Sequence, residues 1–428
     1  MANLKAVVFS LRNVFFVEEE KRFDEKKIEQ LIKLIKHLAK QGIKVILHSN
    51  DRWYMLQHGN ITIAQYLSSI TGESISYYNK SDFPAMPKKP KADAIPFILD
   101  QENLKPNEII YVGCNRNDWQ ACINAKILFI KANWLKPDME IPYGFSFDDI
   151  AALARFIDIC CIKANTHNLI SYIDNDVEFY TLSLYSTYKY QFQAYSASAR
   201  STAKKLTQDA EPDFWLMLFI SKIYFSGLYR EIQTIIAFPG HEVGYGNTVM
   251  DETLDIFAKC FRLSYLHDAI IRHTKSVKSQ TARTQGNANL LGIYNHLNTL
   301  YLNLHPRKYG SNVQLKGNPY KGKNILLVDD IATSGYSFDA AKLLLEKAGA
   351  SKVICFSWLK TINTPLNIST EPLSKDYNVY SPIRNAQNYY ADSKPKQIAF
   401  SAIIPSHDIG YEMTRLFTDF LQWNEDIL

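Results

Sequence analysis

The strongest constraint on the fold is the segment 325–337, which reads ILLVDDIATSGYS. It begins as an apolar strand, and two carboxylates, Asp329 and Asp330, follow directly. Helical spacing of apolar residues predicts a helix over 337–348, with Gly349 as its stop. Another apolar strand is predicted over 351–359. Strand, helix and strand in this order form a βαβ unit, which predicts a parallel sheet.

The turn between this strand and this helix has the chemistry of an anion site. Five residues form it: Thr333, Ser334, Gly335, Tyr336 and Ser337. Successive backbone N–H groups before a helix N-terminus can surround an anion, and the helix dipole adds to the attraction. Asp329 and Asp330 cannot bind an anion, but carboxylates accept hydrogen bonds from the neighbouring hydroxyls of a sugar. The pattern predicts a site for a ribose 5-phosphate group, and it is not a Walker P-loop.

A second alternation of strands and helices occupies the first 155 residues. Apolar strands are predicted at residues 6–9, 44–50 and 108–115. A helix is predicted over 25–41, with Asp24 as its N-cap and Gly42 at its end. Strands that are separated by helices and end in polar residues are typical of a parallel α/β sheet.

The predicted fold class is α/β, with two Rossmann-like parallel-sheet domains joined by a mostly helical segment. Residues 1–155 form the first domain, 156–230 a helical linker or insert, 231–365 the second domain and 366–428 a C-terminal extension. An aromatic run at 180–195 could stack nucleobases, but we favour a core or an oligomer interface.

The segment VDDIATSGYS resembles the phosphoribosyl-pyrophosphate (PRPP) binding motif of type I phosphoribosyltransferases. In that family an earlier loop binds pyrophosphate, and FPGH at 238–241 matches it. A basic stretch after it looks like the mobile hood of the ComF-type members. The residues that this resemblance marks for pyrophosphate are Pro239, Gly240, His241, Arg272, Lys275 and Arg283.

The resemblance implies transfer of a 5-phosphoribosyl group from PRPP to an unknown acceptor, with Mg²⁺ and release of pyrophosphate. Asp329 and Asp330 would be the catalytic residues that orient the ribose, and 333–337 would hold the 5-phosphate. No metal ligand from a protein side chain is predicted, because Mg²⁺ is commonly held by phosphates and waters. Thr333 stands where members acting on 6-oxopurines have Asp, which argues against such an acceptor.

Residues 6–134 resemble a haloacid dehalogenase (HAD)-type domain in which several functional positions have changed. Ser10 takes the place of the nucleophilic Asp, and Arg12 that of the acid/base. Ser49 and Lys89 match the second and third motifs of the family.

The fourth HAD motif reads GCNRND, where Cys114 replaces the first Asp and Asp118 is retained. A phosphoaspartyl mechanism needs the first carboxylate as nucleophile and further carboxylates for Mg²⁺. The resemblance therefore implies an inactive domain. Arg12, Ser49 and Lys89 could still bind an anion, and a packing domain without a ligand is the open alternative.

Composition and net charge limit the class of protein and the partners that we expect. Of the 428 residues, 46% are hydrophobic and 21% charged, which excludes disorder over most of the chain. The net charge of +5 is too small to indicate a nucleic-acid partner, although it does not exclude one. No apolar segment reaches the roughly 20 residues that cross a bilayer, and no export signal is visible. We expect a cytoplasmic protein with small-molecule ligands and no membrane contact; a homo-oligomer or a regulatory protein partner stays open.

Three functional hypotheses follow. The first is a PRPP-dependent phosphoribosyltransferase, a pentosyl-transferring enzyme of nucleotide metabolism, stress response or phage defence. The second is a catalytically silent regulatory protein that senses PRPP or a nucleotide. The third, a HAD-type phosphatase, is disfavoured because of Ser10, Arg12 and Cys114.

Overall fold

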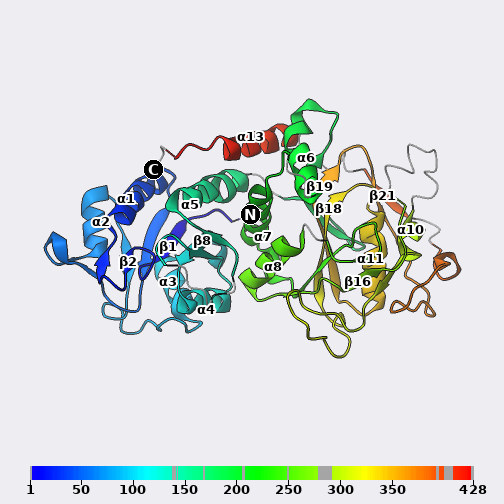
Figure 1. The fold of residues 1–428 in the computed structure, drawn as a ribbon, viewed down its shortest axis with the longest axis horizontal. Coiled ribbons are helices and arrows are strands. Elements are labelled where there is room, and N and C mark those ends of the chain that lie inside the picture. The colour runs from blue at the N-terminus through cyan, green and yellow to red at the C-terminus, as the bar shows by residue number, and fades with distance from the viewer. Residues whose placement is uncertain are drawn as a thin grey trace.

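Two six-stranded sheets organise the chain, one in each half (Figure 1). The computed structural model describes all residues except 1, 137–140, 142, 167–168, 205–207, 248–249, 278–291, 392–394, 400–407 and 426–428. The predicted α/β class with two parallel-sheet units is confirmed. The bounds of the four segments given above stay predictions.

The first sheet has the order β10-β9-β8-β1-β4-β7, and every pairing in it is parallel. Its strands are β1 (Ala6–Ser10), β4 (Lys44–His48), β7 (Ser76–Tyr78), β8 (Ile109–Gly113), β9 (Phe129–Ala132) and β10 (Ser146–Phe147). Since β1 lies between β4 and β8, the carboxyl ends of these three strands meet at one edge. Polar residues from three distant segments are thereby brought together.

Helices cover both faces of this sheet. Helices α1 (Glu25–Lys40) and α5 (Ile150–Phe156) lie on one side in Figure 1, and α3 (Ala94–Glu102) and α4 (Arg116–Ala125) on the other. The predicted cap of α1 is confirmed, because the Asp24 side chain accepts a hydrogen bond of 2.9 Å from the Lys27 backbone N–H. Two short hairpins, β2 (Phe16–Val17) with β3 (Arg22–Phe23) and β5 (Tyr54–Met55) with β6 (Ile61–Thr62), extend from the unit, and α2 (Ile63–Thr71) follows β6.

The second sheet has the order β11-β12-β19-β18-β13-β15. Its strands are β11 (Ile170–Ile173), β12 (Glu178–Tyr185), β13 (Thr234–Ala237), β15 (Ser264–Tyr265), β18 (Asn324–Ala332) and β19 (Lys352–Thr361). Only β11 among them pairs antiparallel with its neighbour. Helix α11 (Tyr336–Lys347) joins β18 to β19, as the βαβ prediction requires.

Smaller elements complete the second unit. A three-stranded sheet consists of β14 (Gly244–Tyr245), β16 (Ile270–Arg272) and β17 (Leu300–Leu302). Helices α8 (Met250–Phe261) and α10 (Ile293–Leu297) and the pair β20 (Leu366–Ile368) with β21 (Lys396–Ile398) lie around it.

The segment 156–230 is not wholly helical. Helices α6 (Tyr190–Ala203) and α7 (Pro212–Ser226) agree with the prediction, but β11 and β12 join the second sheet. Within β12, Phe179, Thr181 and Leu182 are all buried. A strand buried on both faces has no alternating pattern, so periodicity alone could not separate it from a buried helix.

Helix α7 explains how the two units are held together. Its residues are apolar almost all round, which is typical of a helix buried on every side. Trp215 stacks on Trp358 of the second sheet with ring centroids 5.7 Å apart. On the other side, the Tyr224 hydroxyl donates a 2.8 Å hydrogen bond to the Ile109 carbonyl of the first unit.

Among the described residues, no helix is both long and apolar enough to cross a membrane.

The C-terminal helix α13 (Ile409–Leu421), red in Figure 1, packs along α6 at the top of the molecule. Phe417 and Phe420 contact Phe214 of α7, with ring centroids 5.1 and 5.2 Å apart. Beyond the helix, the Trp423 indole N–H donates to Asp158, which also pairs with His37 of α1 at 2.7 Å. The end of the chain thereby contacts both units.

Candidate functional site

The carboxyl edge of the first sheet carries a cavity of about 450 Å³, here called the first cavity. Four cationic side chains line it: Arg12, Lys88, Lys89 and Arg116. Asp51 is the one acidic residue among the lining residues, and Ser10 and Ser49 supply hydroxyls. An excess of positive charge around hydroxyl groups favours the binding of a small anion.

Lys89 is the centre of a buried network beneath this cavity. Its Nζ donates 3.1 Å to Ser10 Oγ and 3.0 Å to the Tyr111 hydroxyl. The same Nζ lies 2.6 Å from Asp118 Oδ1, and the two side chains are 5% and 0% exposed. Three HAD-motif positions predicted from separate segments, Ser10, Lys89 and Asp118, are therefore in direct contact.

Asp118 has a second role at the start of α4. Its Oδ2 accepts the backbone N–H groups of Cys114 (3.2 Å) and Asn115 (3.4 Å). Asn115 in turn caps the helix by accepting from the Asp118 N–H. The thiol of Cys114 is buried, and its Sγ donates to the Lys136 carbonyl at 2.8 Å. Cys114 therefore occupies the position of the lost carboxylate without lining the cavity.

The remaining HAD-motif positions lie at the mouth of the cavity. Arg12 forms ion pairs with Glu18 at 3.0 Å and with Asp51 at 3.5 Å, and its side chain is 46% exposed. Ser49 Oγ donates to the Asp51 carbonyl and lies 3.2 Å from the Tyr77 hydroxyl. Both side chains line the first cavity, Arg12 from an exposed position and Ser49 from a buried one that is 6% exposed.

Two neutral groups complete the network. Burial and then the nearby charge of Lys89 hold the pKa of His48 well below its usual range, so its imidazole is neutral. Burial and then the charge of Asp118 raise the pKa of Tyr111 well above its ordinary value. His48 Nδ1 lies 3.1 Å from the Tyr111 hydroxyl. Sequence analysis missed both residues, although their places in apolar strands beside a polar edge were a usable signal.

The residues of the first cavity do not fit a resident Mg²⁺ ion. Mg²⁺ needs oxygen ligands, commonly one or two free carboxylates. Asp118 is already bound to Lys89 and to two backbone N–H groups, and Ser10 and Cys114 bring no carboxylate. Asp51, the one carboxylate that lines the cavity, pairs with Arg12 at 3.5 Å. Over the part of the chain that the structure describes, no group of three or more His, Cys, Asp or Glu side chains could hold a metal ion.

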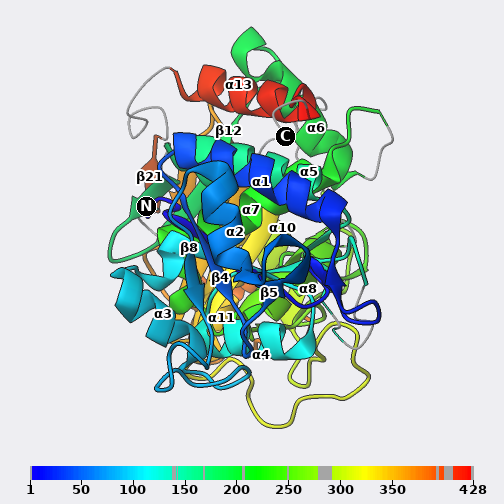
Figure 2. The ribbon, with the colours of Figure 1, turned by 90° about the vertical axis from the view of Figure 1, so that its left-hand side faces the viewer.

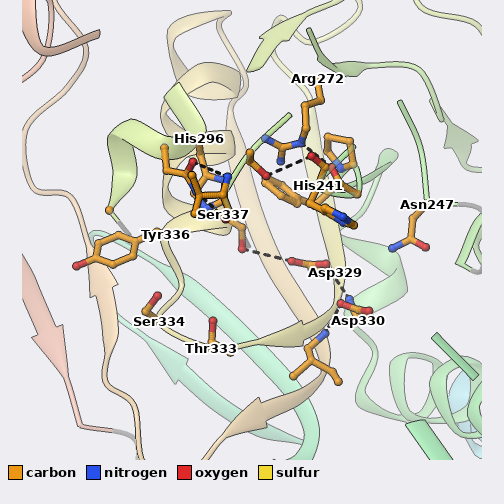
Figure 3. Close-up of a pocket in the computed structure, with 18 of the residues that line it drawn as sticks. His241, Asn247, Arg272, His296, Asp329, Asp330, Thr333, Ser334, Tyr336 and Ser337 are labelled. Atoms are coloured by element: carbon orange, nitrogen blue, oxygen red, sulfur yellow. Dashed lines mark hydrogen bonds between the residues drawn. The ribbon is translucent and has the colours of Figure 1, made fainter. Parts of the chain in front are cut away.

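A second cavity, of about 480 Å³, lies at the carboxyl edge of the second sheet (Figure 3). Asp329 and Asp330 of β18 face it together with Thr333, Ser334, Tyr336 and Ser337. Ser337 Oγ donates to Asp329 Oδ2 at 3.3 Å. Burial raises the pKa of Asp329 well above its ordinary value, and the charge of Asp330 raises it further.

Gly335 belongs to the same turn but points away from the second cavity. Its φ is +80°, in the left-handed region, and a Cβ added there would overlap Leu366 of β20. Glycine is therefore required both by the backbone conformation and by the packing of β20 against the turn.

The residues expected to bind pyrophosphate lie in different environments. Pro239, Gly240 and His241 line the second cavity. Arg272 also lines it, but from β16, where it is 1% exposed and donates to the Gly240 carbonyl at 2.5 Å. Burial lowers the pKa of Arg272 to about 10. Arg272 is thus a fixed wall of the cavity.

Of the other two expected basic residues, Lys275 is not among those that line the second cavity. The Lys275 side chain is 60% exposed and pairs with Glu242 at 2.6 Å. Arg283 lies outside the described residues. Sequence analysis missed His296, Asn247 and Lys204, which do line the cavity. Burial and then the charge of Arg272 lower the pKa of His296 to about 3. Lys204 follows α6, so no sequence signal linked it to β18.

Residues 11–132 match the family model described as haloacid dehalogenase-like hydrolase. The first unit is therefore HAD-like, as the sequence predicted. A search of curated proteins found no match.

Several solved structures are similar to the first part of the chain. A heptose bisphosphate phosphatase from B. bronchiseptica, complexed with magnesium and phosphate, has 16% identity and a TM-score of 0.27, covering 35% of this chain and 96% of its own. A protein assigned as a β-phosphoglucomutase from Bacteroides vulgatus has 14% identity and a TM-score of 0.24. The alignment covers 31% of this chain and 76% of that protein. A protein assigned as a phosphoglycolate phosphatase from Lactobacillus delbrueckii has 18% identity and a TM-score of 0.25. The alignment covers 30% of this chain and 52% of that protein.

The comparisons contradict the predicted function. The matching family is one of hydrolases, so the prediction of a PRPP-dependent phosphoribosyltransferase is wrong, and so is the low rank given to a HAD-type hydrolase. The inactivity predicted for the first unit and the PRPP-sensing alternative are overturned with it. The physical reason is that a strand, two acids and a turn specify a local shape, which does not by itself specify a reaction. The predictions about partners remain predictions.

Proposed function

We propose that the first unit binds phosphate monoesters in the first cavity and hydrolyses them through Ser10, without a resident metal ion. The observation that carries this proposal is the position of Lys89 Nζ, 3.1 Å from Ser10 Oγ and 2.6 Å from Asp118 Oδ1. The hydrolase family match over residues 11–132 supports the reaction class. A weak nucleophile needs such a partner to take its proton.

The charges of the first cavity support phosphate binding without a cation. In a HAD-type site with an Asp nucleophile, a metal ion offsets the repulsion between that carboxylate and the phosphate. Ser10 is neutral, and four cationic side chains line the cavity. The four cationic side chains outnumber the one acidic residue of the lining, Asp51, so a phosphate dianion is attracted on balance, and Arg12 can donate to its oxygens.

The proton and bond changes balance within these side chains and water. Ser10 Oγ attacks phosphorus as the bond to the alcohol oxygen breaks; Lys89 takes the serine proton and passes one of its own to Asp118. The departing alkoxide takes a proton from water, and the resulting hydroxide attacks the phosphoserine. Inorganic phosphate leaves, and the proton returns from Asp118 through Lys89 to Ser10.

Replacement of Ser10 tests this proposal. We expect Ser10→Ala to lower the release of inorganic phosphate from aryl phosphates at least ~100-fold, because the nucleophile is lost. The Kd for the ester, measured by calorimetry, should change less than about twofold, since other groups hold the phosphate. EDTA should change neither value. Ser69→Ala, an exposed serine of α2, is the matched control.

The possible outcomes separate the parts of the proposal. Binding without phosphate release in the unaltered protein would overturn hydrolysis and keep binding. Release that disappears in EDTA would overturn the metal-free mechanism. Absence of binding to any phosphate monoester would overturn the proposal as a whole.

We also infer that the second cavity binds a small anion that carries neighbouring hydroxyl groups. The specific observation is that Asp329 and Asp330 share this cavity with Thr333, Ser334 and Ser337. The hydrogen-bond donors of the turn can bind the anion, and the carboxylates can accept hydrogen bonds from the hydroxyl groups. No reaction is proposed there.

Asp329→Asn should stabilise the protein while weakening this binding. The folded state holds the Asp329 pKa above its ordinary value of 3.8, so ionisation of Asp329 opposes folding. Removing the charge should raise stability at neutral pH by on the order of 1 kcal/mol, since one unit of pKa corresponds to about 1.4 kcal/mol. The gain should shrink as pH falls through the raised pKa and vanish below 3.8. Binding of glycerol 3-phosphate should weaken more than that of inorganic phosphate.

Melting temperatures from pH 3 to 8 and calorimetric titrations provide the two measurements. A variant that melts below the unaltered protein at neutral pH would contradict the stability prediction. Equal losses for both probes would contradict the role given to the carboxylates.

A further inference from the structure

A third cavity, here called the apolar cavity, lies between the two hairpins of the first unit. Its volume is about 350 Å³. The residues that give it its apolar character are Phe16, Phe23, Trp53, Tyr54, Met55 and Leu56. They come from β2, β3, the segment before β5, β5 itself and the turn after it, and Figure 2 shows β5 on the side of the first unit that faces the viewer.

The apolar cavity adjoins the first cavity through one side chain. Trp53 lines both. The guanidinium carbon of Arg12 lies 5.8 Å from the Trp53 ring centroid, and the ring of Phe16 lies 4.1 Å from it. Arg12 lines the first cavity and Phe16 the apolar cavity, so the three side chains form a row that leads from one to the other.

The apolar cavity is open to ligands. Leu56 is 73% exposed and Tyr54 38%, whereas Phe16, Phe23 and Met55 are buried. Large apolar side chains that gather at a hollow and stay in contact with water are a common mark of a binding site. Cationic Lys21, Arg22 and Arg52 also line it, but Arg22 pairs with Glu20 and Arg52 with Asp82, so the apolar side chains rather than charge favour a ligand here.

We propose that the apolar cavity holds the aromatic part of the phosphate ester whose phosphate lies in the first cavity. This inference rests on the proposed function and adds the substrate class: monoesters of aromatic alcohols. Four of the apolar walls are aromatic rings, which favour a flat ring as occupant because edge and offset ring contacts add to the gain from burial.

The measurement compares two probes that share a phosphate. Calorimetry in EDTA with the full-length Ser10→Ala protein gives the Kd of 1-naphthyl phosphate and of methyl phosphate without turnover. We expect the aromatic ester to bind at least ~10-fold more tightly, equivalent to about 1.4 kcal/mol. Arg12→Ala should weaken both, which assigns the binding to the first unit rather than to the second cavity.

Two substitutions test the cavity itself. Leu56→Ser changes an exposed side chain, so folding should be unaffected, and Trp53→Leu removes the shared ring. Each should reduce the preference for the aromatic ester at least ~3-fold. Leu56→Ser, which alters only the apolar cavity, should also leave the Kd of methyl phosphate unchanged. Ile70→Ser, an exposed position of α2 that lines neither cavity, should change nothing.

The outcomes distinguish this inference from the proposed function. Methyl phosphate that binds as tightly as the aromatic ester would overturn the apolar cavity as a substrate site and leave phosphate binding intact. A preference that survives both Leu56→Ser and Trp53→Leu would overturn it as well. Failure of both probes to bind would overturn the inference together with the proposed function.

Discussion

Lys89→Met is expected to destabilise the protein by about 3–5 kcal/mol, because it leaves the carboxylate of Asp118 buried without its cation. Asp118 is 0% exposed in its side chain, and the pair is 2.6 Å apart. Two backbone N–H groups still reach Asp118, but they do not neutralise it. Urea unfolding followed by circular dichroism measures the loss. The same variant should also abolish phosphate release, since the Ser10 proton can no longer pass through Lys89 to Asp118.

Two comparison proteins separate charge from packing. In Lys89→Met/Asp118→Asn the carboxylate is gone as well, so most of the stability should return while the Asn oxygen still caps α4. Lys136→Met breaks an ion pair of similar length, 2.5 Å to Glu19, but on the surface, and its urea midpoint should not move measurably. A Lys89→Met midpoint equal to that of Lys136→Met would show that the buried pair does not stabilise the first unit.

Gly335→Ala is expected to cost about 2–4 kcal/mol, the second largest effect. A non-glycine residue at φ +80° costs about 1–2 kcal/mol. The new methyl group would overlap Leu366 Cδ1 and lie 3.2 Å from its Cγ, and overpacking typically costs about 1–3 kcal/mol. Either the buried Leu366 side chain or the turn at the second cavity has to move to make room. Thermal unfolding gives the loss, and glycerol 3-phosphate titration shows whether the turn still binds.

Gly317→Ala is the matched control for this substitution. Gly317 has φ +76°, and a Cβ there meets nothing within 4 Å, so only the conformational cost of about 1 kcal/mol should appear. The difference between the two variants measures the packing of Leu366 on the turn. If both lose the same stability, the contact with Leu366 does not hold the turn in place.

Local elements were readable from the sequence because neighbours along the chain decide them. Asp24 caps α1 as predicted, since a carboxylate three residues before a backbone N–H can accept from it in any fold. Strand β18 and helix α11 lie where the segment 325–348 placed them within one or two residues. The HAD-motif residues Ser10, Arg12, Ser49 and Lys89 line one cavity, and Asp118 lies beneath it.

Long-range contacts decided what the sequence left open or led us to misjudge. Strand β12 was expected to be helical, and its parallel pairing with β19, in which Glu178 lies opposite Ile354, determines its form. The predicted transferase came from the turn at 333–337 and two weaker matches, the loop 238–241 and a basic stretch, whereas the match to a hydrolase family extends over residues 11–132. Ser10 was interpreted as the loss of the nucleophilic Asp, and only the fold shows that Lys89 contacts it.

The sequence by itself therefore determined the two parallel α/β units, the cap of α1 and the polar residues that end their strands, because these follow from local periodicity and hydrogen bonding. The tertiary structure alone decided that Lys89 joins Ser10 to Asp118 and that Trp53 connects two cavities. The physical reason is that these contacts are made by residues far apart in the chain, whose side chains meet only after burial of the apolar core has positioned the strands.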